Sequence, residues 1–217
     1  MKKPQRYDTS HLPESQFEPG SHDHVLKNKL GITSPDVMDR LEKEEQLRAI
    51  EELTDLFDIN HRFNAADISK IHEIWLANIY EWAGKYRQVK MSKGDFPFAF
   101  PEQIPKLMVE FEKGPLCDFT PCHFKSHDEI TKALAVIHTE LLLIHPFREG
   151  NGRVARMLSI LMGLQAGLPP LDFQDMITKD KEEYIRSIQF GVSGDYAPME
   201  KVFSKVIRKT LRAREQQ

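Results

Sequence analysis

Apolar side chains recur every three to four positions along most of the chain, which is the spacing of one face of an α-helix. An early example follows Ser34 and Pro35, where leucine and isoleucine recur at this spacing as far as Leu56. Serine is favoured just before a helix and proline in its first turn, so a helix is expected to begin here. Its charged residues, from Glu42 to Glu52, are expected to form a solvated face.

The same periodicity predicts a mostly helical protein. Further helices are expected at residues 65–80, 101–113, 127–143, 151–166, 180–190 and 196–213. One stretch has a different pattern, because RQVKMSKGDFPFAF (87–100) contains a short alternating run, then Gly94, then several aromatic residues. This pattern is typical of a β-hairpin with a glycine turn.

The two ends of the chain differ in composition. Residues 1–23 are polar and rich in proline, serine and glycine, which predicts a loosely ordered N-terminal arm before one domain at 24–217. A length of 217 residues is ample for a single domain with a real core. The formal net charge is −3, so no overall field favours nucleic acid or an anionic membrane surface, and neither is expected as a partner.

Cysteine usage and the N-terminus indicate the compartment. Two cysteines, Cys117 and Cys122, do not make a disulfide framework, which fits a reducing compartment. They lie near His123 and His127, but the spacing differs from the usual two-pair zinc arrangement. No apolar run follows the N-terminal lysines and no 18 apolar residues are consecutive, so neither a secretory signal nor a membrane span is expected. A cytoplasmic location is expected, or delivery into another cell without a cleaved signal.

Candidate chemistry is concentrated in residues 145–156, which read HPFREGNGRVAR. The preceding helix is expected to end at His145, because Pro146 disfavours helix in the residue before it. The next helix is expected to start at two glycines, Gly150 and Gly152, which let backbone N–H groups approach a ligand closely. A helix N-terminus has unpaired N–H groups and a partial positive charge, and both favour phosphate binding.

The side chains around this helix start fit chemistry on a bound phosphate. Arg153 and Arg156 share one face of the first turn, and guanidinium groups suit bidentate phosphate contacts. Glu149 is an oxygen ligand of the kind that Mg²⁺ uses together with substrate phosphates. His145 can take up a proton near neutral pH, and Phe147 is expected to anchor the loop in the core. The set predicts phosphoryl or nucleotidyl transfer.

These twelve residues resemble the signature of the Fic family, His-x-Phe-x-Asp/Glu-Gly-Asn-Gly-Arg-x-x-Arg, and every specified position matches. Residues 80–100 also resemble the segment that leads into the flap hairpin of that family. The resemblance implies an all-α fold, a Fic (Fido-like) helical bundle with one β-hairpin flap. It also implies a protein adenylyltransferase that moves AMP from ATP to a hydroxyl side chain of a target protein with Mg²⁺.

The resemblance assigns a role to each position. His145 would deprotonate the Tyr, Ser or Thr hydroxyl of the target, and Glu149 would hold Mg²⁺ between the α- and β-phosphates. The nucleotide would be bound by an anion hole and by two arginines at its β- and γ-phosphates: Gly150, Asn151, Gly152, Arg153 and Arg156. The flap would clamp a target segment by strand addition through Met91, Ser92, Lys93 and Gly94.

Other interpretations stay open at this point. The same fold could transfer another nucleotide's monophosphate, phosphocholine or phosphate, although relatives that phosphorylate are known for a lysine where this chain has Gly152. A non-catalytic nucleotide-binding adaptor or toxin-partner module is the other class, and His145 argues against it, because binding alone requires no base. Ser92–Asp95 could be merely a hairpin turn. Trp75, Trp82 and the cluster Phe96–Phe100 are expected in the core rather than as a base-stacking platform.

The resemblance also raises the question of control. Many Fic proteins are inhibited by a helix with Ser/Thr-x-x-x-Glu-Gly/Asn, whose glutamate pairs with the second motif arginine, here Arg156. The chain has no full match, because Glu14 is followed by Ser15 and Glu73 by Ile74, and Pro13 makes a poor inhibitory helix. We therefore expect no self-inhibition. A separate small antitoxin that supplies the glutamate is expected instead, or a target that is absent from the producing cell.

Overall fold

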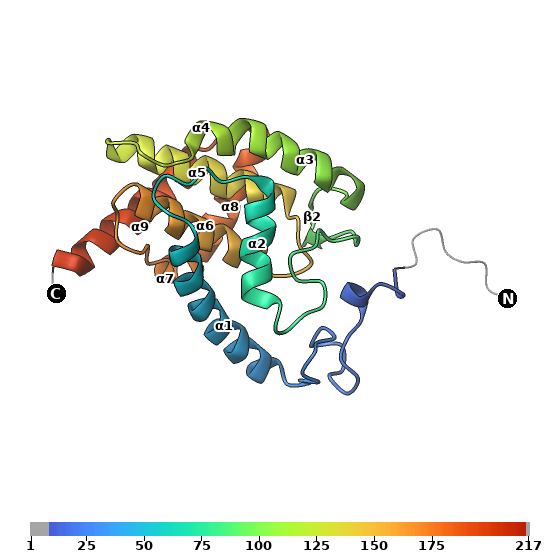
Figure 1. Ribbon diagram of the computed structural model, residues 1–217. Coiled ribbons are helices and arrows are strands. Elements are labelled where there is room, and N and C mark those ends of the chain that lie inside the picture. The colour runs from blue at the N-terminus through green and yellow to red at the C-terminus, as the bar shows by residue number, and fades with distance from the viewer. Residues whose placement is uncertain (1–8, 216–217) are drawn as a thin grey trace.

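The computed structural model describes residues 9–215, so the first eight residues of the expected arm lie outside it. The long helices are α1 (Pro35–Leu56), α2 (Ala65–Leu76), α3 (Ile104–Phe111), α5 (His127–Ile144), α6 (Asn151–Gln165), α8 (Lys181–Phe190) and α9 (Ala197–Glu215) (Figure 1). Shorter elements are α4 (Cys117–Phe119), α7 (Gln174–Ile177), a π-helical turn (Glu112–Leu116) and 3-10 turns at Pro13–Ser15, Pro101–Gln103 and Gly191–Ser193. The predicted all-α fold with one hairpin is confirmed.

Two predicted helices have different limits from those expected. The helix expected at 65–80 ends at Leu76, although the Tyr80 N–H still bonds to the Leu76 carbonyl at 2.9 Å as the chain turns away. The helix expected at 101–113 begins as a 3-10 turn and continues beyond α3 into the π-helical turn, which contains Pro115. Proline has no N–H for a regular helical bond, which accounts for irregular helix at that point.

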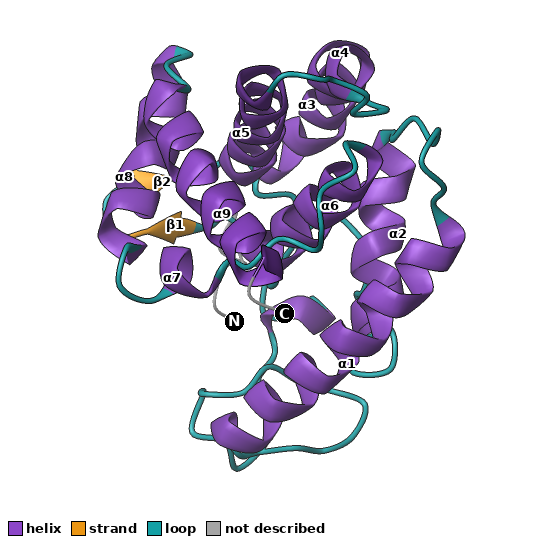
Figure 2. Ribbon diagram, turned by 90° about the vertical axis from the view of Figure 1, so that its left-hand side faces the viewer, coloured by secondary structure: helices purple, strands orange, loops and turns teal. Residues whose placement is uncertain are grey.

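Helix α5 lies at the centre of the molecule, where it contacts α3, α6, α8 and α9 (Figures 1 and 2). It begins with a capping box in which Ser126 and Glu129 each accept the other's backbone N–H through their side chains. The helix is apolar on nearly every side, so it is buried along most of its length. Because its start and its packing are both fixed, the residue that ends it, His145, has a defined place.

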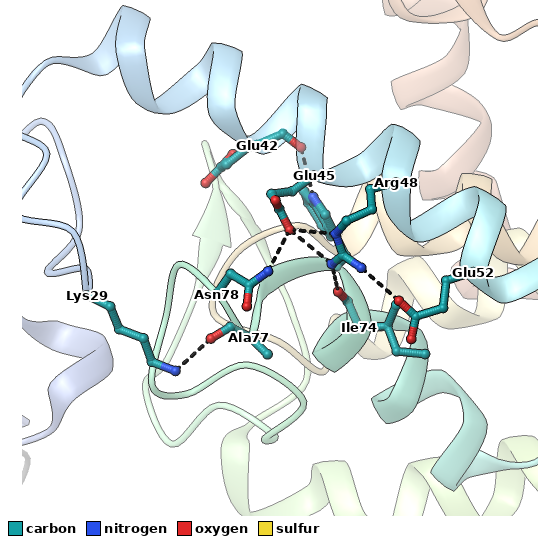
Figure 3. A network of polar contacts seen from close by, with 9 residues as sticks. Lys29, Glu42, Glu45, Arg48, Glu52, Ile74, Ala77 and Asn78 are labelled. Atoms are coloured by element: carbon teal, nitrogen blue, oxygen red, sulfur yellow. Dashed lines mark hydrogen bonds and ion pairs between the residues drawn. The ribbon is translucent and has the colours of Figure 1, made fainter.

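Helix α1 packs along α2, and Arg48 connects the two (Figure 3). Arg48 pairs with Glu45 at 2.9 Å and Glu52 at 2.7 Å on α1, and donates to the Ile74 carbonyl on α2 at 2.6 Å. Each surface ion pair of this kind contributes only about 0–1 kcal/mol. On the same helix Glu42 faces the interior, where it is 5% exposed.

The predicted hairpin consists of β1 (Ser92–Lys93) and β2 (Phe96–Pro97), which lies beside α7 and α8 in Figure 2. The strands are antiparallel, with Ser92 opposite Pro97 and Lys93 opposite Phe96. Gly94 has a φ of 58° in the two-residue turn, a conformation that suits glycine. The two turn residues and the β1 strand are exposed, whereas Phe96 is half-buried.

Residues 9–23, expected to be loosely ordered, make defined contacts with the domain. The buried Glu14 carboxylate accepts the Gln88 N–H at 2.6 Å, and the Glu14 carbonyl accepts from Arg148 Nε at 3.0 Å. Phe17 and Leu26 form an isolated antiparallel bridge. The arm therefore lies against both the strand that leads to the hairpin and the motif loop, while a boundary at residue 24 stays a prediction.

Within residues 9–215, no helix combines the length and apolarity that crossing a bilayer requires.

Candidate active site

His145 ends α5 in a left-handed conformation, with φ 52° and ψ 59°. A residue other than glycine costs about 1–3 kcal/mol there, so the surrounding structure must hold it. Arg87, which is 1% exposed, does so: its Nε donates to the His145 carbonyl at 2.7 Å. Its two terminal nitrogens donate to the carbonyls of Val89 at 2.6 Å and Ala99 at 2.7 Å. Arg87 thus fastens the histidine to both ends of the hairpin, a role that its sequence position gave no sign of.

The His145 ring has a defined proton arrangement. Its Nδ1 lies 3.2 Å from the Leu142 carbonyl, which can only accept, so Nδ1 carries the proton and Nε2 carries the lone pair. The ring stacks on Phe98 with centroids 3.6 Å apart and planes 12° from parallel. Burial lowers the pKa of His145 to about 4, and the charges of Arg87 and Lys93 add to this. The imidazole is therefore neutral near pH 7.

The motif loop is closed by Asn151 and anchored by Phe147. The Asn151 side chain accepts the Phe147 N–H at 2.9 Å and donates to the Phe147 carbonyl at 2.8 Å, while Phe147 is fully buried, as predicted. Gly150 has a φ of 83°, and a Cβ there would come within 2.4 Å of the Trp75 ring. Only glycine fits at this position. The first turn of α6, whose N–H groups have no partner within the helix, therefore begins at the end of a fixed loop.

His72 on α2 supports the same loop through a hydrogen bond and a ring contact. Its Nδ1 accepts the Gly84 N–H at 2.8 Å, so its Nε2 donates to the Glu149 carbonyl at 3.2 Å. The ring stacks on Phe147 with centroids 4.0 Å apart. Burial lowers the pKa of His72 to about 3, which keeps the ring neutral and this pattern of donor and acceptor fixed. Sequence reasoning did not identify His72, because its partners come from two distant segments.

The Glu149 side chain is 46% exposed and lies at the start of α6. Its Oε1 accepts the Gly150 N–H at 2.9 Å and lies 3.6 Å from Arg153 Nη2, and Oε2 has no hydrogen bond within the part of the chain that is described. No group of three His, Cys, Asp or Glu able to hold a metal occurs among residues 9–215. A single outward carboxylate fits Mg²⁺ bound mainly through substrate phosphates, and does not fit a metal held by protein alone.

Arg153 is compensated by a buried carboxylate. Its Nη2 lies 2.7 Å from Glu42 Oε2, and its guanidinium lies over the Trp75 ring at 4.5 Å. The Tyr80 hydroxyl donates to the other Glu42 oxygen at 2.8 Å. The expected solvated face of α1 is thus wrong for Glu42, because a cation and a hydroxyl satisfy this carboxylate inside the protein.

Arg156, one turn further along α6, is half-buried and has a different partner. It contacts the Tyr184 hydroxyl, and no acidic residue forms an ion pair with it within the described ranges. Burial lowers the pKa of Arg156, and the contact with Tyr184 opposes this. Glu14 and Glu73, the two glutamates considered for self-inhibition, are bound to Gln88 and Lys70 respectively.

A cavity of about 310 Å³ lies between the hairpin, the motif and α8. The motif lines it with His145, Gly152 and Arg156, and the hairpin with Lys93, Phe96 and Phe98. Ile177, Ile185 and Ile188 form an apolar wall opposite them. The cavity brings together an apolar wall and a wall with the Arg156 cation and the neutral His145 imidazole.

The remaining predicted residues lie around this cavity or behind it. Met91 and Ser92 line a second hollow, of about 370 Å³, on the side of the hairpin toward the arm and Arg148. Trp75 and Trp82 are buried in the core as predicted, at 0% and 5% exposed. The same prediction is wrong for Phe96–Phe100: these residues flank an exposed turn, and two of them face the cavity.

Comparisons with known proteins agree with this geometry. The sequence model of the Fic/DOC family matches residues 62–162, which contain the whole motif. The probable protein adenylyltransferase Fic of Escherichia coli (strain K12) is 31% identical over 63% of this chain and 66% of its own length. The chain belongs to the Fic/DOC family. A second Fic relative, the probable protein adenylyltransferase y4lH of Sinorhizobium fredii, is 28% identical over 83% of this chain and 89% of its own length.

A solved Fic structure is similar over most of the chain. It is the BepC protein of Bartonella tribocorum, a VirB-translocated effector, with bound AMPPNP. The TM-score is 0.71, the identity is 26%, and the match covers 90% of this chain and 97% of that one. Since the match with the Escherichia coli Fic protein leaves about a third of that protein uncovered, its activity is a hypothesis for this chain rather than a property of it.

Proposed function

We propose that this protein is a protein adenylyltransferase, which moves AMP from ATP to a Tyr, Ser or Thr hydroxyl of a target protein. The observation that carries the proposal is His145: its Nε2 lone pair is fixed by the bond from Nδ1 to Leu142, and its ring lines the cavity. A binding module has no use for a neutral imidazole held in a left-handed backbone at a phosphate-binding helix start. Similarity to proteins named adenylyltransferases, and to one solved with AMPPNP, supports the same activity.

The reaction follows from these positions. His145 Nε2 takes the proton of the target hydroxyl as its oxygen attacks the α-phosphorus of ATP. The bond from this phosphorus to the bridging oxygen breaks, and pyrophosphate leaves with the electron pair. The N–H groups of Asn151 and Gly152, and that of Gly150 once it leaves Glu149 Oε1, stabilise the developing negative charge. Glu149 and the substrate phosphates would hold Mg²⁺, which would supply further positive charge to the leaving group.

The two motif arginines contribute unequally to binding the phosphates of the nucleotide. Arg156 faces the cavity with its charge uncompensated, so it holds the terminal phosphates. Arg153 is ion-paired with Glu42, so its contribution to phosphate binding is smaller. Met91, Ser92, Lys93 and Gly94 hold the target segment against the hairpin by strand addition.

Two labels of ATP distinguish this activity from its alternatives. The purified protein is incubated with a cell lysate and Mg²⁺, using ATP labelled with ³²P at the α- or the γ-position. Protein-bound label is expected from α-labelled ATP alone, and His145→Ala should reduce its rate ~10²–10⁴-fold with ATP affinity within a few-fold. Label from γ-labelled ATP indicates phosphate transfer, and no label with intact ATP binding indicates a binding module.

Glu149 offers a separate test of the metal. Glu149→Gln keeps the size of the side chain and removes its charge, so Mg²⁺ is expected to bind the enzyme–ATP complex more weakly. The rate should then need a higher Mg²⁺ concentration for half-saturation, and Arg156→Gln is the control that should leave this concentration unchanged. Equal Mg²⁺ titration curves for the Glu149 variant and the parent protein would remove Glu149 as a ligand.

Control by a separate protein is a further part of the proposal. Arg156 has no acidic partner among residues 9–215, so we propose that an inhibitory carboxylate comes from a small antitoxin, or that the target is absent from the producing cell. The protein expressed alone should modify itself or slow growth, and His145→Ala should relieve the effect. A purified protein that is silent until Glu14 or Glu73 is changed to Gly would place the inhibitor within the chain.

A further inference from the structure

A row of buried polar groups leads away from Arg156: Tyr184 lines the cavity, and His138 and Ser159 lie behind it. His138 is fully buried in α5, with Nε2 at 2.9 Å from the Tyr184 hydroxyl and Nδ1 at 3.2 Å from Ser159 Oγ. Ser159 is also fully buried and donates to the Ala155 carbonyl at 2.8 Å. Tyr184 in turn contacts Arg156. Neither His138 nor Ser159 lines the cavity, so neither reaches a ligand there directly.

The direction of every hydrogen bond in this row is determined by its two ends. A guanidinium can only donate, so the Tyr184 oxygen accepts from Arg156 and its own O–H points to His138 Nε2. At the other end, the Ser159 O–H is used on the Ala155 carbonyl, so Ser159 Oγ accepts from His138 Nδ1–H. His138 is therefore neutral with its proton on Nδ1. Burial lowers its pKa to about 3 and raises the pKa of Tyr184 to about 12, so both groups keep these forms across the physiological range.

We propose that Ser159, His138 and Tyr184 are positioning residues that hold the Arg156 guanidinium toward the terminal phosphates of the nucleotide. The inference rests on the proposed function, since it assigns the row to the binding of a nucleoside triphosphate. The row fixes the Tyr184 oxygen as an acceptor, and this acceptor orients Arg156 without cancelling its charge. A carboxylate in the same place would orient Arg156 equally well and would neutralise it, as Glu42 does for Arg153.

A histidine satisfied in the core is the simpler explanation for His138, and it makes a different prediction. A purely structural row would affect folding stability and leave the preference for ATP over AMP unchanged, because AMP lacks the phosphates that Arg156 is proposed to hold. Tyr184 lines the cavity and Ser159 does not, so a change of this preference in Ser159→Ala is the one that acts through Tyr184 and Arg156. The ratio of the two affinities is therefore the informative quantity.

The experiment measures the dissociation constants of Mg-ATP and AMP by calorimetry, with the full chain carrying His145→Ala to prevent turnover. Tyr184→Phe is expected to weaken ATP binding roughly tenfold, the usual effect of losing a hydrogen bond to a charged group, with AMP binding changed less than about twofold. Ser159→Ala should shift the ratio in the same direction by a smaller factor. It should have no further effect once Tyr184 is Phe, because both act through one row.

Matched controls remove the same groups elsewhere. Tyr196→Phe removes a hydroxyl bonded to Glu140, and Ser21→Ala removes a buried hydroxyl in the N-terminal arm; neither should change the ratio. If the ratio of ATP to AMP affinity is unchanged in both Tyr184→Phe and Ser159→Ala while the parent still prefers ATP, the positioning role of the row is wrong. The proposed function is unaffected by that result. A parent protein that does not prefer ATP overturns the proposed function itself. If Tyr184→Phe does not fold, the ratio in Ser159→Ala decides.

Discussion

Arg153 and Arg156 lie one helical turn apart in the same motif, yet their surroundings differ in the property that matters for binding phosphate. Arg153 forms a 2.7 Å ion pair with Glu42, which is buried against α2 and also bonded to Tyr80. Arg156 contacts only the neutral hydroxyl of Tyr184 among the charged and polar side chains described. The charge of Arg153 is therefore neutralised by an ion pair within the fold. The charge of Arg156 has no such partner and lies beside the cavity.

The difference shows that a position in the motif does not determine whether the charge of its arginine is free to bind phosphate. Both arginines fit a signature for phosphate binding, and the sequence gives no reason to separate them. Their partners decide the matter: Glu42 comes from α1 and Tyr184 from α8, on opposite sides of the motif helix. The first arrangement ties the motif helix to α1, and the second leaves the Arg156 cation without an acidic partner among the described residues.

Removing the Glu42 charge that pairs with Arg153 should have the largest effect on the free energy of unfolding. Glu42→Gln leaves the half-buried Arg153 with only the longer 3.6 Å contact to Glu149, and loss of one partner of a buried pair costs about 3 kcal/mol. The free energy of unfolding, measured with urea, should fall by about this amount. Arg156→Gln should leave it unchanged or slightly higher, because it removes a cation that has no counter-charge. Equal losses in the two variants would contradict the comparison.

Removing the Tyr80 hydroxyl that bonds to Glu42 should lower the free energy of unfolding by a smaller amount. Tyr80→Phe deletes the bond to Glu42 Oε1 and leaves the ion pair with Arg153 in place, which should cost about 1–2 kcal/mol in urea unfolding. In the Glu42→Gln background the loss should shrink, because the charge that strengthened this bond is gone. Full additivity of the two substitutions would show that Tyr80 and Glu42 do not act together.

The smallest effect expected is a nearly flat pH profile around neutrality. The pKa of His145 is lowered to about 4, so the basic form that accepts a proton persists well below the ordinary histidine range. Activity per enzyme should change little between about pH 6 and 8 and fall only toward pH 4. Lys93→Met removes a nearby positive charge, so the pKa of His145 should rise and the acid limb should move to higher pH. An NMR titration of the His145 ring in free protein checks both values, and a parent pKa near 6.5 would contradict the geometry.

Sequence reasoning located the site because its chemistry is contiguous. The twelve residues from His145 to Arg156 carry the base, the carboxylate, the glycines and both arginines, and the helix limits around them follow from Pro146 and Gly150. The hairpin was equally accessible, since Gly94 lies between two short extended runs. Local pattern was enough wherever function depends on neighbours in the chain.

The rest depended on contacts between distant segments. Glu42 has the sequence surroundings of a solvated helix face, and only the packing of α1 on α2 turns it inward toward Arg153. Arg87 looks like a surface residue until three carbonyls surround it. The phenylalanines at the hairpin were expected in the core for the same reason: apolar character predicts burial, and it does not distinguish a core from the wall of a cavity.

The measurement that tests the account most directly compares ATP and AMP binding to Arg153→Gln and Arg156→Gln. Arg156→Gln should lose most of the preference for ATP, because the uncompensated cation holds the terminal phosphates. Arg153→Gln should retain most of the preference while its urea midpoint falls. Calorimetric titration of both nucleotides into both variants gives the two ratios. A preference for ATP that disappears with Arg153→Gln and survives Arg156→Gln would contradict the division between the compensated arginine and the available one.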